Sequence, residues 1–325
     1  MVVPNSDEQA VMCPRCGYDL RGEIASWRES CPLAGRCGEC GLGVAWHDLL
    51  TEGALPPAWC VEFAPPRRVP VAVATTLAAS LIPLWFWGSI RMTYRVRPRR
   101  LVVYAVLMVV TGYAMLMAAN ALFVYSDWQK FGGRITSTMS VGEAMTRAML
   151  LPFSSEPLGQ VNIGPRMAPY ISPVSILEYL WGGWDLLTYG TIVAILGPCS
   201  LMGLVVSRRR AGVRRGHVAR TLVYSLGWVV VLWAIGLAIM LPYYTAWYGP
   251  VMALWLPRLD YVLIVAIPGF VLVWWYGAIR RYLQMEHSFA VASAVTVLAV
   301  GGGLVTMSFI QPRFAEYAFE LLGLV

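Results

Sequence analysis

Five cysteines lie in the first 40 residues of this 325-residue chain, and four of them form two similar pairs. The pairs are Cys13-Pro-Arg-Cys16 and Cys37-Gly-Glu-Cys40. In such a pair one tight turn can direct two sulfurs to one metal ion, and tetrahedral Zn²⁺ takes four thiolates at ~2.3 Å. The four sulfurs should therefore converge within ~4 Å of one another. The spacing predicts a structural zinc site, and zinc would supply folding free energy that so small a domain lacks.

Other features bear on the ligand set and on the chemistry. Gly17 and Gly41 follow the pairs and can adopt the positive φ that completes each turn. Cys31, which begins "CPLAGRC", competes with Cys37 as a ligand, and the paired spacing favours Cys37. A redox pair would use a single CxxC in a βαβ context, which the sequence does not indicate. A disulfide framework suits a secreted chain, but residues 1–10 hold no apolar signal segment and the cysteine count of seven is odd.

Two stretches resemble known families. "CPRCGYDLRG" followed by "RCGECG" resembles the N-terminal zinc ribbon of multi-pass, planctomycete-type bacterial membrane proteins of unknown function. The usual proline of the second pair is Gly38 here, and the segment between the pairs is longer. "HVARTLVYSLGWVV" and "VWWYGAIRRYLQMEHSFAVASAVTVLAV" are similar to the third-to-fifth-span region of the five-span Yip family, whose Asp-Leu-Tyr-Gly-Pro signature is not present. The first resemblance implies a zinc ribbon and no particular activity.

The rest of the chain has the composition of a membrane protein. Hydrophobic residues make up 58% of the chain and charged residues 13%, whereas soluble domains are roughly 25% charged. The apolar residues come in uncharged blocks long enough to cross a bilayer as helices. We expect an all-α polytopic membrane protein with about six transmembrane helices, or five if the first stretch, interrupted by Pro83, is re-entrant. The stretches are 69–90, 101–125, 186–206, 221–244, 261–279 and 288–310.

These patterns divide the chain into domains. Residues 1–50 are expected to form the zinc ribbon, 51–68 a Pro-rich linker that contains the thiol of Cys60, and 69–325 the transmembrane domain. Residues 126–185 are expected to be a long extramembrane loop. Trp and Tyr gather beside the ends of the spans, near Trp181 and Trp247, as in the interfacial belts of membrane proteins.

Arginines set the expected orientation. By the positive-inside rule the Arg-rich loops are cytoplasmic, which predicts that Arg95 and Arg209 share one side and that Trp181 and Trp247 lie near the other. These loops would attract anionic lipid headgroups rather than nucleic acid. The loop arginines are Arg91, Arg95, Arg97, Arg99, Arg100, Arg208, Arg209, Arg210, Arg214, Arg215, Arg220, Arg280 and Arg281. Six spans would place the ribbon outside and five inside; we expect the bacterial inner membrane and slightly favour a cytoplasmic ribbon.

The sequence indicates no catalytic set. The six stretches contain no Asp, Glu, Lys, Arg or His, which argues against ion-coupled transport. His47, His217 and His287 are scattered, and no phosphate-binding, zinc-protease or nucleophile motif is present. We therefore expect a non-enzymatic membrane adaptor or organiser that presents the ribbon to a protein partner, with homo-oligomers left open. The alternatives are a permease or channel component, which predicts a polar cavity, and a lipid-acting enzyme, which predicts polar groups converging at one headgroup level.

Overall fold

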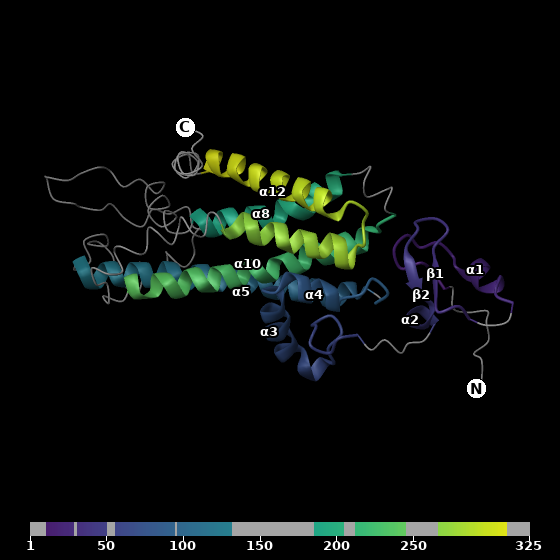
Figure 1. The fold of residues 1–325 in the computed structure, drawn as a ribbon. Coiled ribbons are helices and arrows are strands. Elements are labelled where there is room, and N and C mark those ends of the chain that lie inside the picture. The colour runs from purple at the N-terminus through teal and green to yellow at the C-terminus, as the bar shows by residue number, and fades with distance from the viewer. Residues whose placement is uncertain are drawn as a thin grey trace. The chain divides into compact units, whose positions relative to one another are not determined.

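The structure is a computed structural model of the chain and describes residues 11–28, 31–50, 56–94, 96–131, 185–204, 212–244 and 266–310. Most of these residues are helical (Figure 1). The chain divides into two compact units. Unit 1 comprises Met1–Ala105, Ala194–Gly227 and Phe270–Ala299, and unit 2 comprises Val106–Val193, Trp228–Gly269 and Val300–Val325.

Residues 11–50 form a small domain, called the ribbon below. Strands β1 (Ala34–Arg36) and β2 (Gly43–Ala45) pair in antiparallel fashion. Helix α1 (Arg21–Ala25) precedes the strands and helix α2 (Trp46–Leu50) follows them. The buried core of the ribbon consists of Cys13, Leu20, Cys37, Leu42, Val44 and Trp46. A core of this size is too small to stabilise a domain alone, so the ribbon depends on further interactions.

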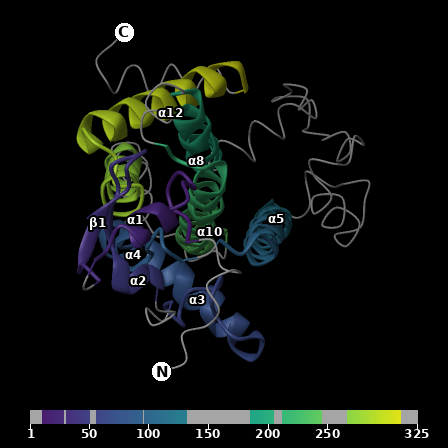
Figure 2. The same ribbon diagram turned by 90° about the vertical axis from the view of Figure 1, so that its right-hand side faces the viewer.

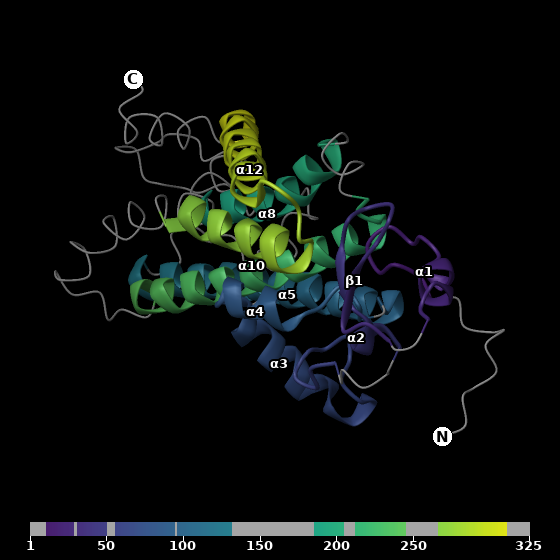
Figure 3. The same cartoon turned by 45° about the vertical axis from the view of Figure 1, so that its right-hand side comes forward.

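The first apolar stretch, predicted to cross the membrane as one helix, is divided into two. Helix α3 (Val69–Ser80) ends before Pro83, and helix α4 (Pro83–Ser89) begins there with a change of direction (Figure 3). Proline has no N–H for the helix and clashes with the preceding turn, so Ile82 leaves the helical region, with φ −115° and ψ 77°. The 12 residues of α3 span about 18 Å, short of a ~30 Å hydrocarbon core. The prediction of one continuous helix over 69–90 was wrong.

The segment predicted as a linker packs closely where the structure describes it. Cys60, Glu62 and Ala64 are buried, and the backbone N–H of Val61 donates to Thr76 Oγ1 of α3 at 3.0 Å. A single 3₁₀ turn, η1 (Pro66–Arg68), then leads into α3. Residues 56–68 are therefore part of unit 1 rather than an extended connection.

Each of the other five apolar stretches falls on a helix. The helices are α5 (Pro98–Phe131), α8 (Asp185–Gly203), α10 (Arg215–Tyr244), residues 266–277, and α12 (Ser288–Ile310). Residues 266–277 continue into a π-helical turn, η3 (Ala278–Tyr282). Helix α5 extends past the predicted start of the extramembrane loop, and residues 132–184 of that loop lie outside the described residues.

Three of the described helices are long and apolar enough to cross a membrane. Their apolar segments are Pro98–Met115, Arg215–Ala238 and Ser288–Phe309, and α8 adds a shorter apolar segment, Thr188–Gly203. The predicted number of six spans is not confirmed. Arg95, Arg209, Trp181 and Trp247, on which the sidedness prediction was made, lie outside the described residues.

Apolar side chains project outward along these helices. On α5, Val102 is 60% exposed and Val109 is 62% exposed; on α12, Val297 is 69% exposed and Phe309 is 83% exposed. Exposed apolar surface of this extent is unfavourable in water and ordinary in hydrocarbon. The length, composition and exposure of these helices are consistent with a membrane protein.

Aromatic rings form the core of unit 1. Phe86 of α4 meets Tyr224 of α10 at a centroid distance of 5.1 Å. The ring centroid of Trp87 lies 5.2 Å from that of Trp274 and 5.2 Å from that of Tyr282. All five side chains are buried, so this cluster holds α4 against α10 and against the end of the helix that contains residues 266–282.

In unit 2, small residues bring helices close together. A Cβ added to Gly303 of α12 would lie 2.8 Å from Val193 Cγ2 of α8. Trp233 of α10 donates from Nε1 to Thr191 Oγ1 of α8 at 3.1 Å. The absence of a side chain at Gly303 therefore lets α12 approach α8 closely.

Candidate metal centre

The structure brings the four predicted cysteine ligands together. The sulfurs of Cys13, Cys16, Cys37 and Cys40 all lie within 4.8 Å of one another. Cys13 Sγ is 3.6 Å from Cys40 Sγ, and Cys16 Sγ is 3.7 Å from Cys37 Sγ. Four thiolates at ~2.3 Å from a tetrahedral ion would be about 3.8 Å apart, so the arrangement fits one metal ion.

The first knuckle, residues 13–18, is closed by backbone hydrogen bonds. The N–H of Cys13 donates to the carbonyl of Tyr18 at 2.8 Å, and the N–H of Gly17 donates to the carbonyl of Cys13 at 2.9 Å. Gly17 has φ +83°, a left-handed conformation that glycine adopts at little cost. This confirms the predicted role of Gly17 in the turn.

The second knuckle, residues 37–42, repeats the first. Cys37 N–H donates to the Leu42 carbonyl at 3.0 Å, and Gly41 N–H donates to the Cys37 carbonyl at 2.9 Å. Gly41 has φ +66°. Strands β1 and β2 flank this knuckle and fix its position, because β1 ends just before Cys37 and β2 begins just after Leu42.

Cys31 lies apart from the cluster. Its side chain is exposed, and its thiol donates to the carbonyl of Pro32 at 3.5 Å. The alternative in which Cys31 replaces Cys37 is therefore not the arrangement that the structure adopts.

The thiols of the cluster are shifted from ordinary acidity. Burial raises the pKa of Cys16 and that of Cys40. For Cys37, burial is outweighed by hydrogen bonds from the backbone of Cys40 and Glu39, so its pKa is lowered. A metal binds thiolates, and its binding would release protons from the raised groups.

The ribbon is docked on the helices through Arg15, which lies between the two cysteines of the first knuckle. Its guanidinium donates to the carbonyls of Leu283 at 3.0 Å, Gln284 at 2.8 Å and Cys40 at 3.3 Å. Leu283 and Gln284 follow the π-helical turn η3, where carbonyls lack partners within the helix. A cation at this end is also favoured by the helix dipole. Arg15 is 5% exposed, so its side chain is largely shielded from water.

The loop before α10 completes the docking surface. Gly212 has φ +65°, and a Cβ at this position would lie 3.0 Å from Cys16 Cβ and 3.1 Å from Cys40 Cβ. The backbone at Gly212 therefore lies directly on the two knuckles, close enough that a side chain would crowd them. Figure 2 shows the ribbon toward the viewer, over the ends of these helices.

His217, in the first turn of α10, joins the first knuckle to a buried network. His217 Nε2 lies 2.7 Å from the carbonyl oxygen of Pro14, and Nδ1 lies 2.7 Å from the hydroxyl of Tyr282. A carbonyl only accepts, so Nε2 carries the proton of a neutral ring and Nδ1 accepts from Tyr282. His217 and Tyr282 thereby have fixed donor and acceptor roles.

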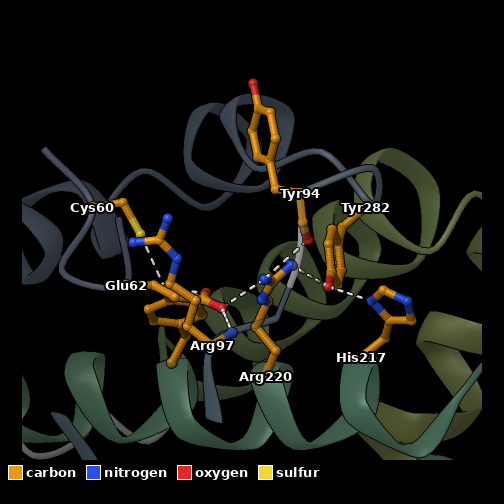
Figure 4. Close-up of polar contacts among 8 residues, drawn as sticks. Cys60, Glu62, Tyr94, Arg97, His217, Arg220 and Tyr282 are labelled. Carbon is orange, nitrogen blue, oxygen red and sulfur yellow. Dashed lines mark hydrogen bonds and ion pairs between the residues drawn. The ribbon is translucent and has the colours of Figure 1, made fainter. Parts of the chain in front are cut away.

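At the centre of this network, Glu62 and Arg220 form an ion pair with no exposed side-chain surface (Figure 4). Arg220 Nη2 donates to Glu62 Oε1 at 2.6 Å, and Nη1 donates to the Tyr282 hydroxyl at 2.9 Å. The backbone N–H of Arg97 also donates to Glu62 Oε1, at 2.7 Å. The expectation that Arg220 contacts lipid headgroups was wrong, because Glu62 holds it in the protein interior.

The network ends at a buried thiol. Tyr224 donates its hydroxyl proton to Glu62 Oε2 at 3.1 Å, and Cys60 Sγ lies 3.0 Å from the same hydroxyl. Since the Tyr224 proton is directed to Glu62, the Cys60 thiol is the donor in the second contact. A continuous hydrogen-bonded chain thus runs from the Pro14 carbonyl to Cys60.

Sequence reasoning did not find most of this network. It treated His217 as scattered and Arg220 as a lipid contact, and it did not consider Glu62. One local signal was available: Glu62 is the single charge in the apolar run "AWCVEFAP", and a charge in such a run is expensive to bury without a partner. His287, another of the scattered histidines, is exposed.

No protein-family model, no curated protein and no solved structure matches this chain.

Proposed function

We propose that the chain is a non-enzymatic integral membrane protein whose structural zinc ribbon is docked on the cytoplasmic ends of its helices and offers its outer face to a protein partner. The observation that carries the proposal is the position of the knuckles. The same two turns gather four sulfurs within 4.8 Å and, through Arg15, cap the helix that ends at η3. The same short segment therefore carries metal ligands and attaches the ribbon to the helices.

Zinc is the metal that this donor set supports best. Four thiolates in a tetrahedral arrangement select zinc or iron. A closed site with four protein ligands and no open position suits a structural ion rather than a catalytic one. Metal analysis of the purified chain would distinguish zinc from iron.

The contacts of the ribbon favour five spans with the ribbon inside. Five helices have one end in unit 1: the starts of α5, α10 and α12 and the ends of α8 and of residues 266–277. These are the ends beside the Arg-rich segments, which the positive-inside rule assigns to the cytoplasm. The ribbon contacts two of these ends: the start of α10 at His217, and the helix that continues into η3 at Leu283 and Gln284. A cytoplasmic ribbon then requires that α3 and α4 do not cross, in agreement with their interruption at Pro83.

The exposed surface of the ribbon is the part left for a partner. Leu33 is 90% exposed and Tyr18 is 41% exposed, whereas Arg15 and the knuckle cores are buried. Leu33 gives this surface an apolar side chain that a partner would cover. The adaptor proposal therefore places the partner on the Leu33 face.

A lipid-acting enzyme is the second candidate, because His217, Arg220, Glu62 and Tyr282 converge near one set of helix ends. Such convergence is what an enzyme would need. However, these side chains are all buried, with His217 the most exposed at 4%, and both oxygens of Glu62 are engaged by protein donors. This favours a structural role for the network.

Photo-crosslinking from the full-length chain in its native membrane tests the adaptor function. A photoreactive residue at Leu33 should trap one reproducible protein, and Cys13→Ser should abolish the crosslink. The matched control is Val305 of α12, also exposed, which should crosslink to lipid. A Leu33 probe that traps no protein, or that traps the same protein when Cys13 is replaced, would refute the adaptor proposal.

A further inference from the structure

We infer that the ribbon is a metal-dependent latch: loss of its metal undocks the first knuckle, and the hydrogen-bonded network behind it opens as far as Cys60. This inference rests on the metal site of the proposed function and adds a consequence for the helices. It uses residues that the adaptor function leaves without a role, namely the buried chain from His217 to Cys60.

The docking contacts come from residues between the metal ligands. Pro14 and Arg15 are the two residues that separate Cys13 from Cys16. The carbonyl of the first accepts from His217, and the guanidinium of the second caps Leu283 and Gln284. Because metal and turn fold together in a domain with so small a core, removing the metal removes the geometry that presents both groups.

Undocking would remove the contacts that hold the loop after η3, where two residues have strained backbone conformations and two carbonyls accept hydrogen bonds from Arg15. Gln284 and His287 have φ +50° and +52°, left-handed conformations that are unfavourable for these residues. The Arg15 guanidinium donates to the carbonyls of Leu283 and Gln284, and Gln284 is the first of the two residues with positive φ. Without Arg15, nothing in the described contacts of Leu283 and Gln284 satisfies those carbonyls, and the loop can relax.

The effect can pass inward because the groups from Pro14 to Cys60 form one continuous hydrogen-bonded chain. If Pro14 leaves, Nε2–H of His217 loses its acceptor, and the ring is free to exchange its tautomer. A proton on Nδ1 would then compete with Arg220 for the Tyr282 hydroxyl, which can no longer donate to His217. Weakening that contact removes one of the groups that hold Arg220, which also donates to Glu62 and to the Tyr94 carbonyl. Glu62 in turn holds Tyr224 over Cys60.

Cys60 is the reporter for this opening, and Cys31 is the control. Cys60 is 0% exposed and lies at the far end of the network, whereas Cys31 is exposed and outside the metal cluster. The full-length chain in lipid nanodiscs is treated with a zinc chelator or left untreated. Alkylation of each cysteine is then followed at one fixed pH by peptide mass spectrometry, with the zinc content measured in parallel.

We expect chelation to raise the Cys60 alkylation rate about tenfold or more, as local opening events of this kind do, with the Cys31 rate unchanged. Adding Zn²⁺ back before alkylation should restore protection. Arg15→Ala should keep the metal yet expose Cys60, whereas Arg21→Ala, whose partner Asp19 lies in the ribbon itself, should behave as the unaltered chain.

The possible failures are distinguishable. If the chelator removes zinc and the Cys60 rate stays the same, the latch is wrong and the zinc site stands. The latch is equally wrong if zinc-loaded Arg15→Ala protects Cys60 as well as the unaltered chain does. If the purified chain holds no metal, the zinc ribbon of the proposed function fails, and the latch fails with it.

Discussion

His217 Nε2 lies 2.7 Å from the carbonyl oxygen of Pro14, although 203 positions separate the two residues. Pro14 is inside the first cysteine pair, and His217 lies in the first turn of α10, the helix that carries Arg220. This hydrogen bond therefore connects the metal knuckle to the buried ion pair in the helical part of unit 1.

Replacing one partner of the Glu62–Arg220 ion pair should lower the stability of the protein more than replacing both partners. Glu62→Gln leaves an uncompensated buried guanidinium and should lower the free energy of unfolding by about 3–5 kcal/mol. Adding Arg220→Met should recover part of that loss, because no buried charge then remains. The exposed pair formed by Asp19 and Arg21 is the control, and Asp19→Asn should change stability little. Additive losses in the double variant, measured by reversible unfolding in detergent, would show that the pair is not coupled.

Gly212→Ala should weaken metal retention. The new Cβ would meet the Cβ atoms of Cys16 and Cys40 at 3.0 and 3.1 Å, and φ is +65° there, which disfavours a side chain by about 1–2 kcal/mol. Gly43→Ala, in strand β2 of the ribbon, is the control, since a Cβ at Gly43 would meet nothing within 4 Å. The measurement is the rate of zinc loss to a chelator. Equal rates in the two variants would contradict the close contact at Gly212.

Cys60 should make stability depend on alkaline pH. Burial raises the pKa of its thiol from 9.0 to about 11, so the folded state keeps a proton that the unfolded state loses. The stabilisation is complete below the unfolded pKa of 9.0 and is lost as the pH rises through about 11. Cys60→Ala should show a shallower decline over this window. Parallel pH profiles of the melting temperature for the two proteins would argue against a raised pKa.

The ribbon and the Arg-rich helix ends should lie on one side of the membrane. The native Cys31 reports on the ribbon, and Arg215→Cys in a Cys31→Ser background reports on the start of α10; both positions are exposed. A membrane-impermeant maleimide should label both in inside-out vesicles and neither in right-side-out vesicles. Labelling of the two sites from opposite sides would exclude the docked arrangement and restore a crossing by residues 69–90.

Features encoded in neighbouring residues could be predicted from the sequence. The two CxxC pairs carry their geometry within a few residues, and the structure brings the same four sulfurs together. Apolar blocks locate helices because every residue in a span faces lipid or other helices, and five of the six blocks are uninterrupted helices over most of their described residues. The remaining block, residues 69–90, contains Pro83, which indicated that its helix would be interrupted.

Contacts between distant segments could not be predicted in this way. Glu62 meets Arg220 across 158 positions, and no periodicity in either segment records the partnership. Arg220 closes an arginine-rich segment, so its composition indicates a lipid contact, and only the position of Glu62 shows otherwise. In the sequence, Arg15 likewise cannot be distinguished from a solvated arginine of the ribbon. Only the structure shows that it contacts Leu283 and Gln284, just after η3.

The metal content of the purified full-length chain tests the central claim most directly. Elemental analysis should find about one zinc per chain, as one closed four-thiolate site requires. Cys13→Ser should lose that zinc, and Cys31→Ser should retain it, because Cys31 lies outside the cluster. A chain purified without zinc, or a Cys13→Ser variant with undiminished zinc, would contradict the account.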